Sequence, residues 1–147
     1  MRAEEYLRKV RDMKISINSL QRQRDDIKNN IGLIKSSGYE RPAIGSPSKD
    51  KLEKQIIKNI AELESIDRKI ADERVSLIRC RKECFDMIMQ LKDGQCRRFL
   101  LDYFIECKNE IEIANEYHFD NINSIYNLKR RAIRYFRNVH KTNYKTT

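Results

Sequence analysis

Residues 112–136, EIANEYHFDNINSIYNLKRRAIRYF, decide the fold of the C-terminal part of the chain. The stretch opens with a short apolar face made by Ile113, Ala114 and Tyr117. The segment FDNIN at residues 119–123 is typical of a turn, and Asp120 or Asn121 is expected to cap a following helix. Beyond the turn, apolar residues recur three and four positions apart, as one face of a helix requires. The stretch therefore predicts a short helix, a tight turn and a longer helix, which is the order of a helix-turn-helix.

The short helix has a recognisable start and end in the sequence. Asn109 is followed three residues later by Glu112, a spacing that resembles a capping box. The helix is not expected to run past His118. This histidine is predicted to be a residue of the turn, rather than a metal ligand or an acid-base group.

The longer helix has an apolar face and a polar face. The residues expected to point inward are Ile122, Ile125, Leu128, Ala132 and Phe136. The residues expected on the opposite side are Asn123, Asn127, Arg130 and Arg134, with Ser124 and Arg131 adjacent. From Asn121 onward the chain has seven Lys or Arg residues and no acid, whereas residues 93–120 have seven acids against three basic residues. The last quarter is therefore a positively charged surface, and its expected partner is a polyanion.

The side chains on this surface suit double-stranded DNA, which is the partner that the sequence predicts. Asn pairs with adenine edges and Arg with guanine edges in the major groove, while other cations hold phosphates. The candidate DNA-binding residues are Asn121, Asn123, Ser124, Asn127, Arg130, Arg131, Arg134, Arg137 and Lys141. The cations expected at phosphates are Arg131, Arg134, Arg137 and Lys141. A solvated basic face that merely keeps the chain in solution is the simpler interpretation, but the one-signed charge disfavours it.

Two long heptad repeats precede the helix-turn-helix. In the first, the residues spaced by seven are Ala3, Val10, Ile17, Arg24 and Ile31, with Tyr6, Met13, Leu20, Ile27 and Ile34 beside them. In the second they are Ile56, Leu63, Ile70, Leu77, Cys84 and Leu91, flanked by Leu52, Ile66, Cys80 and Met87. Gly and Pro residues forbid continuous helix over a loop at residues 36–48. The pattern predicts two long helices that pair as an antiparallel coiled-coil hairpin.

The polar breaks in the two repeats suggest how the hairpin is aligned. An antiparallel pair places Tyr6 near Arg79 and leaves the end of the second helix free. It also brings Arg24 close to Asn59 and Glu62, so these breaks are expected to specify the register. Apolar residues also lie just outside the seam, namely Leu7, Ile57 and Ile60. They could cover a second copy of the hairpin, giving a homodimer, or the C-terminal domain.

Composition supports an all-α chain with two domains. The 147 residues are 36% charged and 39% hydrophobic, with two Pro and four Gly. This balance excludes both disorder and a thick globular core. The segment KDGQ at residues 92–95 breaks the helical pattern. It is expected to separate a coiled-coil hairpin at residues 1–91 from a helix-turn-helix domain with a basic tail at residues 92–147.

No targeting segment, membrane span or metal site is expected. The first residues lack the continuous apolar core of a signal peptide, and no stretch approaches the ~18 apolar residues of a membrane span. The chain is therefore expected in the cytoplasm, where its four cysteines would be reduced. These are Cys80, Cys84, Cys96 and Cys107. Their spacings match no Cys-x-x-Cys zinc pair, so neither a metal nor a cofactor is expected.

Residues 112–136 resemble the helix-turn-helix of sigma factor region 4, in which an Ile-Ala pair lies on the first helix and a later Ala packs the recognition helix. With the heptad hairpin and the start RAEEYLRKVRDMKISINSLQ, nearly the whole chain resembles small phage-encoded regulators near the RinA and ArpU late-gene transcription regulators. His118 stands where such motifs commonly have Gly, so it must adopt a left-handed backbone at some cost. The resemblance implies a transcription regulator of phage or prophage type that acts at phage promoters in a bacterial cell. It also allows contact between the acidic face and RNA polymerase.

The expected function is sequence-specific DNA binding without catalysis. The sequence has no Gly-rich phosphate loop, and neither His118 nor His140 has a carboxylate at a useful spacing. Two other classes of protein remain open. One is a phage DNA-packaging recognition subunit, which would form a ring, and the other is a coiled-coil adaptor that binds RNA polymerase or another protein. The size of the particle in solution distinguishes the first class, and a DNA-binding assay distinguishes the second.

Overall fold

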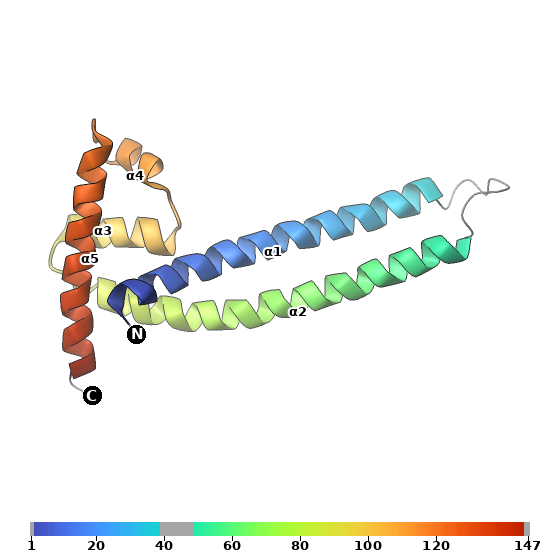
Figure 1. The fold of residues 1–147 in the computed structure, drawn as a ribbon, viewed down its shortest axis with the longest axis horizontal. Helices are drawn as coiled ribbons and strands as arrows, with labels where there is room; N and C mark the ends of the chain where they lie inside the picture. Colours follow the sequence, from blue (N-terminus) through green and yellow to red (C-terminus); the bar gives the residue numbers. More distant parts are fainter. Residues whose placement is uncertain (1, 39–48, 146–147) are drawn as a thin grey trace. The chain divides into compact units, whose positions relative to one another are not determined.

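The chain is all-α, as the sequence predicts. A computed structural model describes residues 2–38 and 49–145, and every element in these two ranges is a helix. The elements are α1 (Ala3–Gly38), α2 (Lys49–Ile88), α3 (Gly94–Leu100), the π-helical turn η1 (Leu101–Ile105), α4 (Glu110–Glu116) and α5 (Ile122–Lys145) (Figure 1). Most of the predicted loop at residues 36–48 lies outside the described residues. No described helix has a stretch long and apolar enough to cross a membrane.

Contacts divide the chain into two compact units that differ from the expected ranges 1–91 and 92–147. The terminal unit combines Met1–Ile15 with Val75–Thr147, and the middle unit is Ser16–Arg74. In the terminal unit, residues from the start of α1 and from the end of α2 and the turn after it are buried, namely Leu7, Val10, Cys84, Met87, Ile88 and Leu91. The division therefore does not follow the helix break at the end of α2. Independent folding of residues 1–91 stays a prediction.

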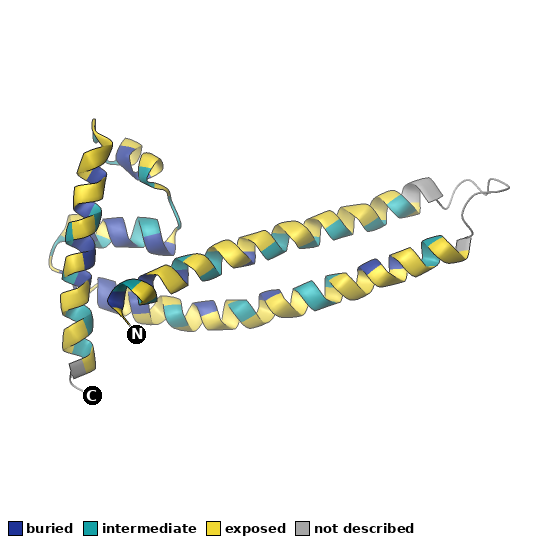
Figure 2. Cartoon of the chain, in the orientation of Figure 1, coloured by how far each residue is buried: buried dark blue, intermediate teal, exposed yellow. Residues whose placement is uncertain are grey.

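In the middle unit, segments of α1 and α2 run antiparallel (Figure 1). The buried residues are Ile17, Ile56, Asn59 and Ile70. The half-buried heptad residues are Leu20, Arg24, Ile27, Ile31, Ile34, Leu52, Leu63 and Ile66. Figure 2 shows buried and half-buried positions recurring along both long helices. Burial thus follows the seven-residue spacing of the sequence.

The register of the two long helices differs from the expected one. Arg24 forms an ion pair with Asp67 rather than with Glu62. Tyr6 was expected near Arg79. In the terminal unit, the Tyr6 carbonyl oxygen instead lies 3.8 Å from the Cys84 Sγ atom. Both partners lie further along α2 than expected, by about one heptad. A slip of seven residues keeps the apolar positions opposed, so the repeat alone cannot distinguish the two registers.

The apolar residues outside the predicted seam have two fates. Ile57 and Ile60 are exposed, as expected. The expectation was wrong for Leu7, which is completely buried in the terminal unit. Leu7 lies between Ala3 and Val10 on one face of α1, and all three are buried, so the buried face is wider there than the predicted seam.

The core of the terminal unit is built around α5. Both α3 and α4 pack against α5. The buried residues of these helices and of η1 are Cys96, Phe99, Leu100, Phe104, Ile105, Ile113, Ala114, Ile125, Leu128, Ala132, Ile133 and Phe136. Ile122, expected to point inward, is 38% exposed. It is the first residue of α5 and lies about 60° around the helix from Ile125, so it falls at the edge of the packed face.

All four cysteines are free thiols in the terminal unit. Cys84 and Cys96 are buried, while Cys80 and Cys107 are half-buried. Burial raises the pKa of the Cys84 thiol to about 12. Within the described part of the chain, no three His, Cys, Asp or Glu residues are grouped so that they could hold a metal ion. Of the four, Cys84 and Cys96 belong to the buried core.

Candidate nucleic-acid interface

The short helix α4 begins at the cap that the sequence predicts. The Asn109 Oδ1 atom accepts a hydrogen bond of 2.8 Å from the backbone N–H of Glu112. The Asn109 Nδ2 atom in turn donates to the Glu112 carboxylate at 2.9 Å. This pair satisfies one of the free N–H groups in the first turn of α4 and fixes where the helix starts.

The turn between α4 and α5 depends on a left-handed residue. His118 has a φ of 58°, and in the described residues only Cys107 is a second non-glycine residue with positive φ. The prediction that His118 is a turn residue with this backbone is confirmed. The backbone N–H of Phe119 donates to the Ala114 carbonyl at 2.9 Å and closes the end of α4.

Asn121, rather than Asp120, caps α5. The Asn121 side-chain oxygen accepts a 3.0 Å hydrogen bond from the N–H of Asn123, and its carbonyl accepts from Ser124 at 3.1 Å. These bonds set the angle at which the chain enters α5. Asn121 was a candidate DNA-binding residue, and the structure shows its side chain engaged at the helix start while the residue as a whole is exposed.

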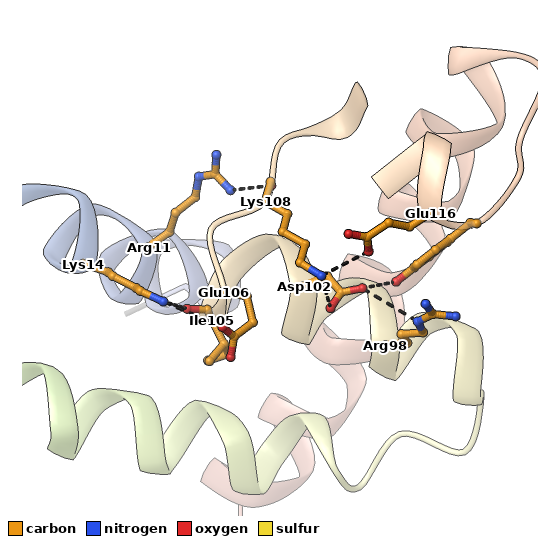
Figure 3. Close-up of polar contacts among 9 residues, drawn as sticks. Arg11, Lys14, Arg98, Asp102, Ile105, Glu106, Lys108 and Glu116 are labelled. Carbon is orange, nitrogen blue, oxygen red and sulfur yellow. Dashed lines mark hydrogen bonds and ion pairs between the residues drawn. The ribbon is translucent and has the colours of Figure 1, made fainter. Parts of the chain in front are cut away.

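A polar network around Asp102 joins η1 to the end of α4 (Figure 3). The Tyr117 hydroxyl donates to the Asp102 Oδ2 atom at 2.6 Å. Lys108 Nζ lies 3.8 Å from Asp102 and 3.0 Å from Glu116, while Arg98 Nε lies 3.8 Å from Asp102. Burial, followed by the hydrogen bond to Asp102, raises the pKa of Tyr117 well above its usual value. The network therefore fixes the start of the turn, which nothing in the local sequence pattern predicts.

Asp102→Ala is expected to lower the free energy of unfolding by about 1–3 kcal/mol, because it leaves the half-buried Tyr117 hydroxyl without its acceptor. Tyr117→Phe removes the hydroxyl itself, so no donor is left without an acceptor, and the free energy of unfolding should fall by less. Urea unfolding of both single variants and the double variant measures the coupling between the two side chains. Strictly additive losses would show that the hydrogen bond does not stabilise the turn.

Two cations of α1 bind the backbone at the end of η1 (Figure 3). Arg11 donates to the carbonyls of Tyr103 and Lys108, and its guanidinium lies 4.0 Å from the centre of the Tyr103 ring. Lys14 donates to the Ile105 carbonyl at 3.3 Å. The carbonyls of Tyr103 and Ile105 belong to the end of η1, and that of Lys108 belongs to the loop after it, so the cations satisfy acceptors at the end of this helical turn. The terminal unit thus needs residues of α1 to hold its C-terminal helices.

Two cations of α5 point into the terminal unit. Lys129 donates to the Tyr103 hydroxyl at 3.1 Å and lies 3.5 Å from Glu110. Arg131, a candidate DNA-binding residue, donates to the Gln95 side chain at 3.1 Å and lies 3.9 Å from Asp93. Hydrogen bonds from backbone N–H groups that Asp93 caps, together with the Arg131 charge, lower the pKa of Asp93. The structure thus places Arg131 against the start of α3.

The other candidates lie together on the exposed face of α5. They are Asn123, Ser124, Asn127, Arg130, Arg134, Arg137 and Lys141, and all are exposed. The Arg137 Nη2 atom pairs with Glu4 at 3.2 Å, and the Arg134 guanidinium lies 5.5 Å from the Tyr135 ring. Within the described residues, Arg130 and Lys141 form no ion pair. The face therefore presents amides toward its start and unneutralised cations along its length.

Two grooves border this face, and both include residues that the sequence pattern did not indicate. One is lined by Glu4, Tyr126, Lys129, Arg130, Ile133 and Arg137. The other is lined by Arg2, Ala3, Glu4, Arg137, His140 and Lys141. The start of α1 thus contributes to a surface formed mainly by α5. No periodicity could have indicated this, because the two segments lie more than a hundred residues apart.

The chain matches no protein-family model, no curated protein and no solved structure.

Proposed function

We propose that this chain is a sequence-specific regulator of transcription that binds double-stranded DNA through α5. In this proposal α4, the turn at His118 and α5 act as a helix-turn-helix, and α1 with α2 acts as an antiparallel coiled-coil hairpin. The observation that supports it most is the exposed face of α5, which carries amides and cations without acids. The resemblance to phage regulators with a region-4-like motif adds phage promoters as the expected site of action.

The length of α5 suggests how the helix would lie on DNA. A major groove is about 12 Å wide, which corresponds to about eight residues of helix. The first half of α5 would therefore lie in the groove, with Asn123, Asn127 and Arg130 at base edges. The second half would lie at the rim, where Arg134, Arg137 and Lys141 meet phosphates. Arg131 would support the position of α5 rather than bind DNA.

Contact between RNA polymerase and the acidic face has weaker support. Glu110 lies near Lys129, Glu112 bonds to Asn109, and Glu116 pairs with Lys108. These acids are therefore engaged within the terminal unit. A recognition function for them would require breaking contacts that hold α4.

A homodimer is the oligomeric state that we propose. An apolar stripe runs along the end of α2 into the turn that follows it, and its residues, Val75, Ile78, Phe85 and Met89, are between 43% and 61% exposed. Exposed stripes of this kind usually mark an interface, and paired helix-turn-helix units bind paired half-sites. Sedimentation analysis would distinguish a dimer from the larger ring expected of a DNA-packaging subunit.

The test of DNA binding uses two charge-matched double variants. Arg134→Gln with Lys141→Gln removes two exposed cations of α5, and Arg79→Gln with Lys82→Gln removes two exposed cations of α2. Loss of two phosphate contacts should flatten the slope of log affinity against log salt by about 2. The first double variant should show this loss on every duplex, and the second should behave as wild type. Equal effects of both variants, or no binding by the wild type at low salt, would contradict the proposed function.

A further inference from the structure

The first turn of α1 lies beside the second half of α5 in the terminal unit. The Glu4 carboxylate is 3.2 Å from Arg137, and the Tyr6 ring lies 6.3 Å from the His140 ring. Arg2 and Lys141 line the same groove, whose volume is about 350 Å³. Side chains from the two helices therefore form one continuous surface.

The charges on this surface are unequal. Its cations from α5 are Lys129, Arg130, Arg137 and Lys141, and Arg2, which directly precedes α1, adds another. Glu4 is the single acid that lines either groove, and it lies with Arg137 where the two grooves meet. The Glu4 and Arg137 side chains are 34% and 53% exposed, so water reaches the ion pair. Such exposed pairs are weak and can exchange partners.

The position of this surface along α5 indicates its ligand. Arg130 and Lys141 are eleven residues apart, which is about 16 Å along a helix axis. A recognition helix contacts base edges with its N-terminal residues. When Arg130 reaches base edges, Arg137 and Lys141, further along α5, therefore lie where the sugar-phosphate backbone passes. The first turn of α1 then reaches the same backbone.

We propose that Arg2, Arg137 and Lys141 together bind a backbone phosphate of the DNA, and that Glu4 competes with this phosphate for Arg137. The inference rests on the proposed function of α5 and adds a second element, the start of α1, to the DNA-binding surface. Arg2 increases affinity for every sequence, because phosphate contacts do not read bases. Glu4 lowers affinity for every sequence, since its charge must be displaced from Arg137 and repels the phosphates.

The test compares substitutions that change the same charge at adjacent places on α1. Glu4→Gln should raise affinity for a random duplex by about two- to fivefold, because the ion pair with Arg137 no longer has to be broken. Glu5→Gln is the matched control, since Glu5 belongs to the same first turn but lines neither groove. The glutamine at position 5 also keeps an oxygen for the hydrogen bond from the Arg2 backbone N–H.

Arg2→Gln should lower affinity by about threefold and flatten the salt slope by about 1, as expected for one lost phosphate contact. Arg8→Gln, an exposed cation of α1 outside both grooves, should leave affinity and slope unchanged. Circular dichroism melting of each variant confirms that binding is measured on folded protein. All affinities are measured with one duplex across a series of salt concentrations.

The outcomes separate the two levels of the proposal. If the wild type binds DNA and the Arg134 and Lys141 double variant weakens binding, the function of α5 stands. If Arg2→Gln then matches Arg8→Gln and Glu4→Gln matches Glu5→Gln, the start of α1 does not bind phosphate and this inference is wrong. Absence of DNA binding by the wild type would overturn both proposals.

Discussion

Phe136→Ala is expected to destabilise the terminal unit by about 3–5 kcal/mol, because it removes a large, completely buried side chain from the packed face of α5. The surrounding helices can close only part of the resulting cavity, so packing contacts are lost as well as burial. Denaturant unfolding followed by circular dichroism measures the loss. DNA binding should fall at temperatures where the unit melts, although every proposed DNA contact is still present.

Tyr126→Ala is the matched control for Phe136→Ala. Tyr126 is also an aromatic residue of α5, but it is 43% exposed and lies outside the packed face. Tyr126→Ala should lower the free energy of unfolding much less than Phe136→Ala does, because the Tyr126 side chain buries less apolar area. Similar losses at both positions would mean that the packed face of α5 is not the one described.

Arg130→Ala and Asn127→Ala are each expected to reduce base preference at one or two positions of a selected DNA site. Loss of one bidentate contact in the major groove costs about 1–3 kcal/mol at its own base pair. Binding to random DNA should stay nearly unchanged, because the neighbouring cations still hold the phosphates. The measurement is selection of bound fragments from random duplexes, repeated with each variant.

Asn138→Ala provides the comparison for Asn127→Ala. Asn138 is an exposed asparagine of the same helix, but it lies beyond the part of α5 expected to enter the groove. The Asn138→Ala protein should recover the wild-type consensus in full. If the Asn127→Ala and Arg130→Ala proteins recover it as well, this face of α5 does not read the sequence.

Local patterns predicted the elements of the candidate site well. The cap at Asn109, the left-handed turn at His118 and the inward face of Ile125 and Phe136 each depend on residues within a few positions of one another. Interactions of this range are encoded by spacing and by residue type. For the same reason, every residue of the two predicted heptad repeats is buried or half-buried.

The register of α1 and α2 could not be predicted in the same way. A heptad repeat specifies which side chains face the partner helix but allows slips of seven residues. Arg24 meets Asp67 in only one of these registers, and packing elsewhere along the two helices decides which register forms. The fate of Leu7 likewise depends on helices that follow it by more than eighty residues, so its neighbours in sequence carry no indication of its burial.

Side-chain direction on α5 was only partly predictable. A helical wheel of α5 assigned Arg131 to the edge of the basic face. The wheel contains only residues of α5, so it does not show acids outside this helix that form ion pairs with its cations. Arg131 turns toward Asp93 and Gln95 at the start of α3. The role of Glu4 beside Arg137 was missed for the same reason, since charge counting along the sequence treats the last quarter as free of acids.

The burial of Leu7 and Val10 among helices from the other end of the chain has a consequence for biosynthesis. Leu7 and Val10 belong to the same compact unit as Phe99 and Phe136, so that core cannot close until all four residues have emerged from the ribosome. Long separations between contacting residues slow folding and leave apolar surface open in the meantime. The middle unit, whose two helical segments are neighbours in sequence, has no such delay. During translation, the helical segments of the middle unit can therefore pair early. This pairing shortens the chain loop between residues 1–15 and residues 75–147, which form the terminal unit.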